Sequence, residues 1–165
     1  MNEFYIPHNL YGFSLSGLTS RILWRLKPFD MCYEVWSNNI DHYLSMLLHD
    51  QPKYILGMGT YFGVDQDNIR IETITKNQFR NYAIEKDLPK TKSILLQPFV
   101  KKTNQTKHAS ALGNSWCNLV SWKIARLIEK GELRAKYAFL HIPKSFSTNT
   151  AVEIIGAMVQ DIKMV

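Results

Sequence analysis

Cysteine is scarce in this chain, whose 165 residues include only Cys32 and Cys117. The two lie far apart and lack the short spacing of paired metal ligands, which excludes a cysteine-based metal site. From the sequence they form either a disulfide or two free thiols, and free thiols are the normal state in an intracellular protein. Cys32 lies in a short apolar run and is expected to be inert.

Long hydrophobic runs are absent as well. No apolar run reaches the length that crosses a membrane, and residues 1–7 lack the basic and apolar parts of a signal peptide. We therefore expect a cytoplasmic protein without a membrane partner. The chain has no repeats or low-complexity segments, and its length suits a single domain over residues 1–165 with a real core.

Acidic residues are in the minority, with 14 Asp and Glu against 20 Lys and Arg, a net charge of +6. Such an excess can attract nucleic acid or acidic surfaces. The basic residues are spread along the chain, however, and their densest group lies in a loop-like stretch (Lys90, Lys92, Lys101, Lys102 and Lys107). We expect no nucleic-acid partner. A basic nucleic-acid-binding domain is a remote alternative, and its affinity would fall steeply with salt.

Hydrophobic periodicity predicts alternating helices and strands. Helical spacing marks residues 18–26, 40–48 and 115–130, and a last helix from Thr150. Runs typical of strands lie at 31–36, 54–59, 69–75, 93–96 and 137–142. The polar stretch 77–92 is predicted to be irregular. This alternation predicts a three-layer α/β/α sandwich with a largely parallel mixed sheet.

The second cysteine lies at the start of a predicted helix. Asn114 or Ser115 is the natural N-cap and Gly131 is placed to end the helix, so Cys117 falls in its first turn. Free backbone N–H groups and the helix dipole favour a thiolate there. His141 lies at the end of a predicted strand, within reach of such a thiol. Sites in α/β folds gather where strands end and helices begin, so the pair points to nucleophilic catalysis by cysteine.

Each of these residues also has an ordinary structural explanation. A lone cysteine is more often a small buried hydrophobe, and a lone histidine at a strand end is more often a satisfied structural residue. Strand periodicity places Glu72 on the face opposite Ile69 and Ile71, which predicts an exposed glutamate. Only the joint pattern supports a catalytic set.

That joint pattern resembles the pyroglutamyl peptidases (pyrrolidone-carboxylate peptidases), cysteine peptidases that remove an N-terminal pyroglutamate. Gly113-x-x-x-Cys117-Asn118 opens a helix, and Phe139-Leu140-His141-Ile142-Pro143 is similar to the family's Phe-Ile-His-Val-Pro. Upstream, the segment from Ile69 to Asn77 is similar to the family's Ile-x-x-Glu-Arg-x-Ala-x-Asn. The resemblance spans about residues 33–160 and is specific around Cys117 and His141.

The resemblance implies a role for each matching residue. Cys117 would be the nucleophile that forms an acyl-enzyme, His141 would take and return the thiol proton, and Glu72 would orient the imidazole. It implies no metal or organic cofactor. The expected substrate is a peptide with a blocked N-terminus, and the family suggests a homo-oligomer.

The expected substrate contacts come from positions where the chain departs from the family. Phe13 and Leu10 are the nearest counterparts of the family's N-terminal aromatic residues, and Arg80 is the nearest candidate for its active-site arginine. Trp116, beside Cys117, is expected to line a pocket. These changes leave a second reading open, a non-catalytic relative that binds a peptide or protein partner in the altered cleft. A working triad is expected to lower the pKa of Cys117 and make its alkylation fast near neutral pH.

Overall fold

The computed structural model describes residues 9–110 and 112–164. Six of its strands form one sheet in the order β2-β1-β3-β8-β4-β7, and β5 pairs with β6 in a separate two-stranded sheet. The strands are β1 (Leu10–Ser14), β2 (Met31–Glu34), β3 (Tyr54–Tyr61), β4 (Ile69–Glu72), β5 (Ile74–Lys76), β6 (Ser93–Leu95), β7 (Thr106–Ala109) and β8 (Lys136–Pro143). The helices are α1 (Gly17–Arg25), α2 (Ile40–Asp50), α3 (Trp116–Glu129) and α4 (Thr148–Val159), followed by a 3₁₀ turn, η1 (Gln160–Met164).

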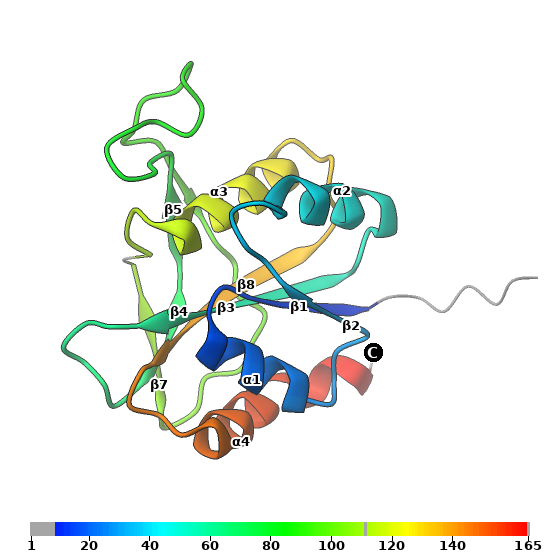
Figure 1. Ribbon diagram of the computed structural model, residues 1–165. Helices are drawn as coiled ribbons and strands as arrows, with labels where there is room; N and C mark the ends of the chain where they lie inside the picture. Colours follow the sequence, from blue (N-terminus) through cyan, green and yellow to red (C-terminus); the bar gives the residue numbers. More distant parts are fainter. Residues whose placement is uncertain (1–8, 111, 165) are drawn as a thin grey trace, which may run out of the picture.

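Helices cover both faces of the large sheet. In Figure 1, α2 and α3 lie above it, and α1 and α4 lie below. Neighbouring strands run parallel except for β4 and β8, which are antiparallel. The predicted three-layer α/β/α sandwich with a largely parallel mixed sheet is confirmed. No helix within residues 9–110 and 112–164 is long and apolar enough to cross a membrane.

The alternation of side chains along each strand divides the core in two. Leu56 and Met58 of β3 pack with α1 and α4, whereas Ile55 of the same strand packs with α2 and α3. Phe139 and Tyr137 of β8 belong to the second cluster. The α2/α3 face of the sheet therefore presents the odd-numbered residues of both central strands, and His141 is one of them.

Two strands are not predicted by the sequence pattern. β1 is buried along its whole length, so it lacks the alternation that marks a half-buried strand. β7 is a polar strand at the edge of the sheet that pairs only with β4. The last helix begins earlier than Thr150, because Ser147 is its N-cap and accepts a hydrogen bond from the Thr150 N–H. Gly131 ends α3 as predicted, with a left-handed φ of +74°.

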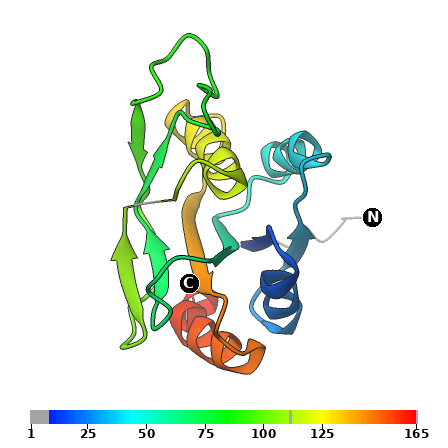
Figure 2. The ribbon, with the colours of Figure 1, turned by 60° about the vertical axis from the view of Figure 1, so that its left-hand side comes forward.

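The stretch 77–92 is irregular, as predicted, and it is tied firmly to its surroundings. The Asn77 amide donates hydrogen bonds to the carbonyls of Glu85 and Leu88 and accepts one from the Glu85 N–H. The Glu85 carboxylate in turn accepts two hydrogen bonds from Arg126 and one from the Trp122 indole, both on α3. The loop extends past the end of the sheet beside α3 (Figure 2).

Candidate active site

One level of the sheet carries a row of residues from five neighbouring strands or strand ends. Gly59 of β3 pairs with His141 of β8, and His141 pairs with Arg70 of β4. On the other side, the Leu15 N–H donates to the Met58 carbonyl and the Val35 N–H donates to the Ser14 carbonyl, so both continue the ladder by one residue. The row therefore runs Val35, Leu15, Gly59, His141, Arg70 across the sheet.

His141 and Glu72 form a buried hydrogen-bonded pair. Nδ1 of His141 lies 2.8 Å from Oε1 of Glu72, and both side chains are buried. Glu72 is thus not the exposed residue that periodicity predicts, because the face of β4 that it occupies is covered. The bond to Nδ1 leaves Nε2 as the ring nitrogen that can exchange a proton with a substrate or nucleophile.

Arg70, two residues before Glu72 on β4, also bonds to this pair. Its Nε donates to the same Oε1 of Glu72 at 3.3 Å, and its Nη1 donates to the Tyr61 hydroxyl at 3.3 Å. The guanidinium also lies over the Tyr61 ring, 4.4 Å from its centroid. Burial by itself raises the pKa of Glu72. The hydrogen bond and charge of His141, with those of Arg70, outweigh burial and hold the pKa below its ordinary value.

The start of α3 is fixed by Asn118. Its buried side chain accepts hydrogen bonds from the Thr75 hydroxyl and the Lys76 N–H, and donates to the carbonyls of Lys76 and Gln78. Ser115 is the N-cap, although its side chain makes no capping bond. The hydrogen bonds of Asn118 therefore replace the missing side-chain cap. They fix the position of the first turn of α3, and with it Cys117, over the sheet.

Cys117 and His141 converge on Gly59. A Cβ added to Gly59 would lie 2.6 Å from the Cys117 Sγ and 3.5 Å from the His141 Cδ2, the ring atom bonded to Nε2. The sulfur and the proton-exchanging edge of the imidazole thus face the same point above β3. The structure thus brings Cys117 and His141 to one point, with Glu72 bonded to the other ring nitrogen of His141.

The electrostatics of the thiol differ from the prediction. Burial, and secondarily the charge of Glu72, raise the pKa of Cys117 to about 12, while the backbone at the helix start acts in the opposite direction. The expected thiolate is therefore wrong for the resting protein, because desolvation outweighs the helix N-terminus. A neutral thiol beside a histidine needs that histidine as a general base at the moment of attack.

Cys32 differs from Cys117 in its position in the fold. Both cysteines are free thiols, which settles the disulfide alternative. Cys32 packs against the core on the α1/α4 face, opposite Cys117, and burial raises its pKa to about 11.

A small groove lies beside Cys117, at the ends of β1 and β2. We call it the Trp116 groove; its volume is about 190 Å³ and it is lined by Leu15, Val35, Trp36, Ser37, Ile40 and Trp116. Trp116 therefore lines a pocket, as predicted. Sequence reasoning missed the other lining residues, whose only signal is that Leu15 and Val35 each come directly after a strand.

The other predicted contacts lie elsewhere. Phe13 is fully buried among the rings of Tyr43, Tyr137 and Phe139, and Leu10 is buried in the core on the opposite face of the sheet. The structure does not bring either to the surface of the site. The exposed Arg80, at a left-handed φ of +53°, lies over the Phe79 ring, 5.2 Å from its centroid.

Arg80 reaches the site indirectly. Phe79 packs against Trp116 with ring centroids 4.8 Å apart, so Arg80 lies behind the Trp116 groove.

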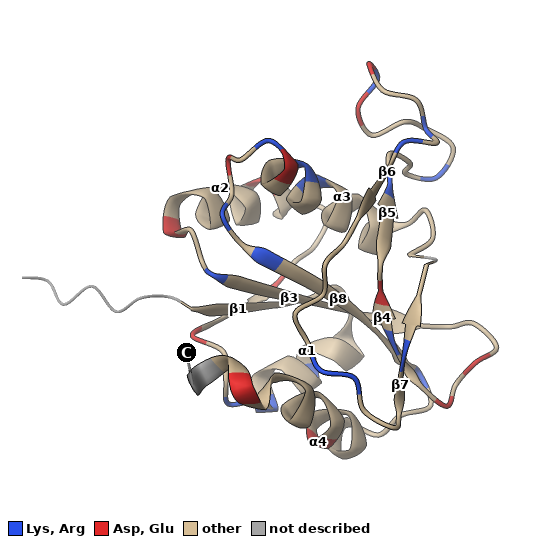
Figure 3. Cartoon of the chain, turned by 180° about the vertical axis from the view of Figure 1, so that it is seen from behind, with Lys and Arg blue, Asp and Glu red and all other residues tan. Residues whose placement is uncertain are grey.

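Lys and Arg residues in general are distributed over both sides of the sheet and the 77–92 loop (Figure 3). Among the described residues, no group of three or more His, Cys, Asp or Glu is arranged to hold a metal ion.

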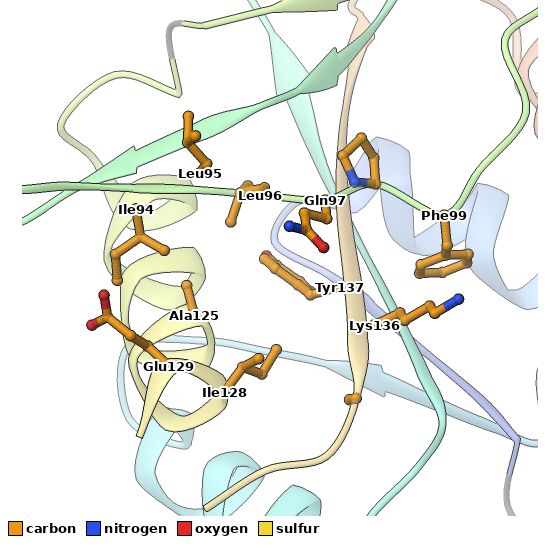
Figure 4. Close-up of a pocket in the computed structure, with 12 residues that line it drawn as sticks. Ile94, Leu95, Leu96, Gln97, Phe99, Ala125, Ile128, Glu129, Lys136 and Tyr137 are labelled. Atoms are coloured by element: carbon orange, nitrogen blue, oxygen red, sulfur yellow. The ribbon is translucent and has the colours of Figure 1, made fainter. Parts of the chain in front are cut away.

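A larger cavity lies away from this site. It measures about 510 Å³ and lies between α3 and the segment 94–99. Figure 4 shows Ile128 of α3 and Leu96 on opposite sides of it, with the Tyr137 ring between them. Cys117, His141 and Glu72 line neither this cavity nor the Trp116 groove. The groove is the nearer of the two to the site, because it contains Trp116, which precedes Cys117, and Leu15, which lies beside Gly59 on the neighbouring strand.

No protein-family model matches the sequence, and no curated protein sequence matches it. Solved structures do match the fold. Pyroglutamyl peptidase I from Bacillus amyloliquefaciens superposes with a TM-score of 0.72 and 13% identity over 94% of each chain. Pyrrolidone carboxyl peptidase from Thermococcus litoralis gives a TM-score of 0.64 and 16% identity, covering 94% of this chain and 91% of that one.

A third structure agrees with these two. Pyrrolidone carboxyl peptidase from Thermus thermophilus gives a TM-score of 0.64 and 14% identity, covering 90% of this chain and 98% of that one. At such identities the comparison concerns the fold, and the fold inferred from the motifs is confirmed. The chain has the fold of the pyroglutamyl peptidases.

Proposed function

We propose that this protein is a cysteine-type omega peptidase of the cytoplasm that removes a small uncharged N-terminal residue, pyroglutamyl or similar, from peptides. One observation carries the proposal: the Cys117 Sγ and the imidazole of His141 converge above Gly59 while Glu72 holds the other ring nitrogen. The names of the solved structures that share the fold support it.

The first half of the reaction forms an acyl-enzyme. Nε2 of His141 takes the proton from Sγ as the sulfur attacks the substrate carbonyl carbon, and a C–S bond forms while the carbonyl electrons move to oxygen. Backbone N–H groups at the start of α3 are candidates to hold that oxyanion. The carbonyl then re-forms, the C–N bond breaks, and His141 gives its proton to the leaving amine.

The second half returns the enzyme to its starting state. His141 takes a proton from water, the resulting hydroxide attacks the thioester carbonyl, and the C–S bond breaks. The proton on His141 returns to the sulfur, which releases a free acid and restores the neutral thiol. Glu72, kept ionised by its neighbours, stabilises the imidazolium in both halves.

The row of residues gives the substrate a direction. The Trp116 groove lies on the Val35 and Leu15 side of Gly59, whereas His141 lies on the other side. Because His141 must protonate the leaving nitrogen, the acyl group belongs in the groove and the rest of the peptide extends past His141 toward Arg70.

The test is release of a fluorescent amine from amides of pyroglutamate and of other small uncharged acids. We expect the Cys117→Ala and Cys117→Ser variants to lose at least about 10³-fold in rate, as nucleophile removal does in other peptidases. Cys32→Ala, the matched control on the opposite face of the sheet, should keep the wild-type rate. Mass spectrometry at short times should show an acyl group on Cys117.

The contrary result would be no amine release and no acyl adduct with any of these amides. The alternative reading, a non-catalytic relative that binds a blocked peptide, would then stand. Its support is the raised pKa of Cys117, and it predicts that a labelled blocked peptide binds wild type and Cys117→Ala equally.

A further inference from the structure

We infer that the acyl group accepted by the Trp116 groove is apolar and uncharged, and that a carbocyclic or aliphatic acyl group is preferred over the lactam of pyroglutamate. This inference rests on the proposed function and specifies its substrate class. It follows from what lines the groove and from what each lining group is already bonded to.

The groove offers a lactam few hydrogen-bond acceptors. Among its six lining residues (Leu15, Val35, Trp36, Ser37, Ile40 and Trp116), the indoles of the two tryptophans can only donate, and the Ser37 hydroxyl is the one side-chain group that can accept. The N–H groups of Leu15, Val35 and Trp36 are committed, since they donate to the Met58 carbonyl, the Ser14 carbonyl and the Asn39 Oδ1 respectively. A lactam N–H entering this groove would therefore find the Ser37 hydroxyl as its one side-chain acceptor and lose water without full replacement.

Within residues 9–110 and 112–164, the groove also lacks a counter-charge for a free α-ammonium group. No Asp or Glu of this part lines it, and the two acids nearest in sequence are engaged elsewhere. Glu34 accepts hydrogen bonds from Ser20 and Trp24, and Asp41 pairs with Lys123. A substrate with a charged amino terminus would be bound without compensation, which favours an uncharged acyl group.

Two tryptophans give the groove apolar surface that a bound group can cover. Trp36 is 49% exposed and Trp116 is 38% exposed, so both leave apolar surface open to a ligand. Phe79 packs against Trp116 and holds its ring in place. Leu15 continues the ladder beside Gly59, so a group covered by these rings lies one strand away from the point where Cys117 and His141 converge.

Three coumarin amides with the same five-membered ring test the inference. Cyclopentanecarbonyl amide is apolar, pyroglutamyl amide is neutral but polar, and prolyl amide carries a charged amine. We expect kcat/KM to favour cyclopentanecarbonyl over pyroglutamyl by about 10- to 100-fold, the range that an apolar pocket achieves, and prolyl to be the poorest. A site with bonds built for the lactam would reverse the order by several powers of ten.

A negative charge placed in the groove tests whether the five-membered ring of the substrate binds there. Ser37→Glu should raise kcat/KM for the prolyl amide several-fold relative to the cyclopentanecarbonyl amide, more at low salt than at high salt. Ser45→Glu adds the same charge on the exposed side of α2, outside the groove, and should leave that ratio at the wild-type value.

The outcomes distinguish a wrong substrate class from a wrong proposed function. Preference for pyroglutamyl would overturn the inference while supporting the peptidase. An equal response of Ser37→Glu and Ser45→Glu would also overturn it, because the ring would then not lie in the groove. Failure of wild type to cleave any of the three amides would overturn the proposed function, and the inference with it.

Discussion

The two sides of Cys117 differ in chemistry although they lie on one level of one sheet. Toward β4, Arg70, Glu72 and His141 form a buried network of charges and hydrogen bonds. Toward β2, the residues that line the Trp116 groove carry no charge, and their side chains are mainly apolar. The first side can orient protons and stabilise charge, whereas the second selects for the shape and the lack of charge of a bound group. Reaction and selectivity should therefore respond to different substitutions.

The difference follows from how each side is bonded. Oε1 of Glu72 accepts from both His141 and Arg70, so the position of each side chain depends on the others. The groove is held by strand ends whose N–H groups bond to neighbouring backbone. Losing one member of the charged network should disturb all of it, while losing one groove side chain should change mainly the fit of the substrate.

The largest effect is expected at Gly59, where the two sides meet. Gly59→Ala would place a Cβ 2.6 Å from the Cys117 Sγ, so the sulfur must move and amide turnover should fall below detection. Overpacking of this kind costs about 1–3 kcal/mol, which thermal unfolding would measure. Gly156→Ala on α4, where an added Cβ meets nothing within 4 Å, should leave turnover unchanged. Wild-type turnover in Gly59→Ala would contradict the convergence on this point.

Glu72→Gln breaks the charged side alone. The amide cannot stabilise an imidazolium as a carboxylate does, so kcat should fall by about 10³- to 10⁴-fold. The KM of the cyclopentanecarbonyl amide should change little, because the groove is intact. Steady-state kinetics with Glu72→Gln and with Glu153→Gln, a change on α4, distinguish this from a general effect of losing a carboxylate.

Arg70→Met should change the pH dependence of the activity, through the ionisation of Glu72 on the charged side. Arg70 helps hold the pKa of Glu72 below its ordinary value, so its loss should raise that pKa. In wild type, the benefit of the carboxylate is fully present above the ordinary glutamate pKa and is lost as pH falls through the lowered value. In Arg70→Met the loss should begin at a higher pH.

Two measurements check that shift. The acidic limb of the kcat/KM profile should move to higher pH in Arg70→Met, because the pKa of Glu72 rises when the guanidinium is lost. Arg70→Lys, which keeps the charge, should restore most of the wild-type profile. An unchanged acidic limb in Arg70→Met, with only a lower Tm, would mean that Arg70 serves packing rather than the ionisation of Glu72.

Trp116→Ala should have the smallest effect, confined to the apolar side. It removes one wall of the groove and the contact with Phe79, which we expect to raise the KM of the cyclopentanecarbonyl amide about five- to tenfold at nearly unchanged kcat. Trp24→Ala, an exposed tryptophan of α1 outside the groove, is the matched control. A fall in kcat without a rise in KM would place Trp116 with the catalytic side instead.

Sequence reasoning located the residues that stand at the ends of elements. Cys117 and His141 could be found because a capped helix start and a strand end leave local signals, and Gly131 marked the end of α3 correctly. The burial of Glu72 could not be found in this way. Periodicity gives the face of a strand, but whether a helix and a neighbouring strand cover that face is a property of the tertiary fold.

The groove was missed for a related reason. The resemblance to the family predicts Phe13 and Leu10 as substrate contacts, whereas β1 buries both and the residue after its end, Leu15, lines the groove. Similarly, the raised pKa of Cys117 depends on how much protein surrounds the sulfur, which a position in a helix does not reveal.

The irregular loop 77–92 has one more consequence, for local opening of the protein. Asn77 organises the loop from within, Glu85 joins it to Arg126 and Trp122, and Asn118 ties the start of α3 to Gln78 in the loop. Separating the loop from α3 would break the bonds of Glu85 and Asn118 together. Amide hydrogens protected in the loop should therefore exchange with deuterium at the rate of the first turn of α3, so that a segment without regular structure opens only when the nucleophile's own helix does.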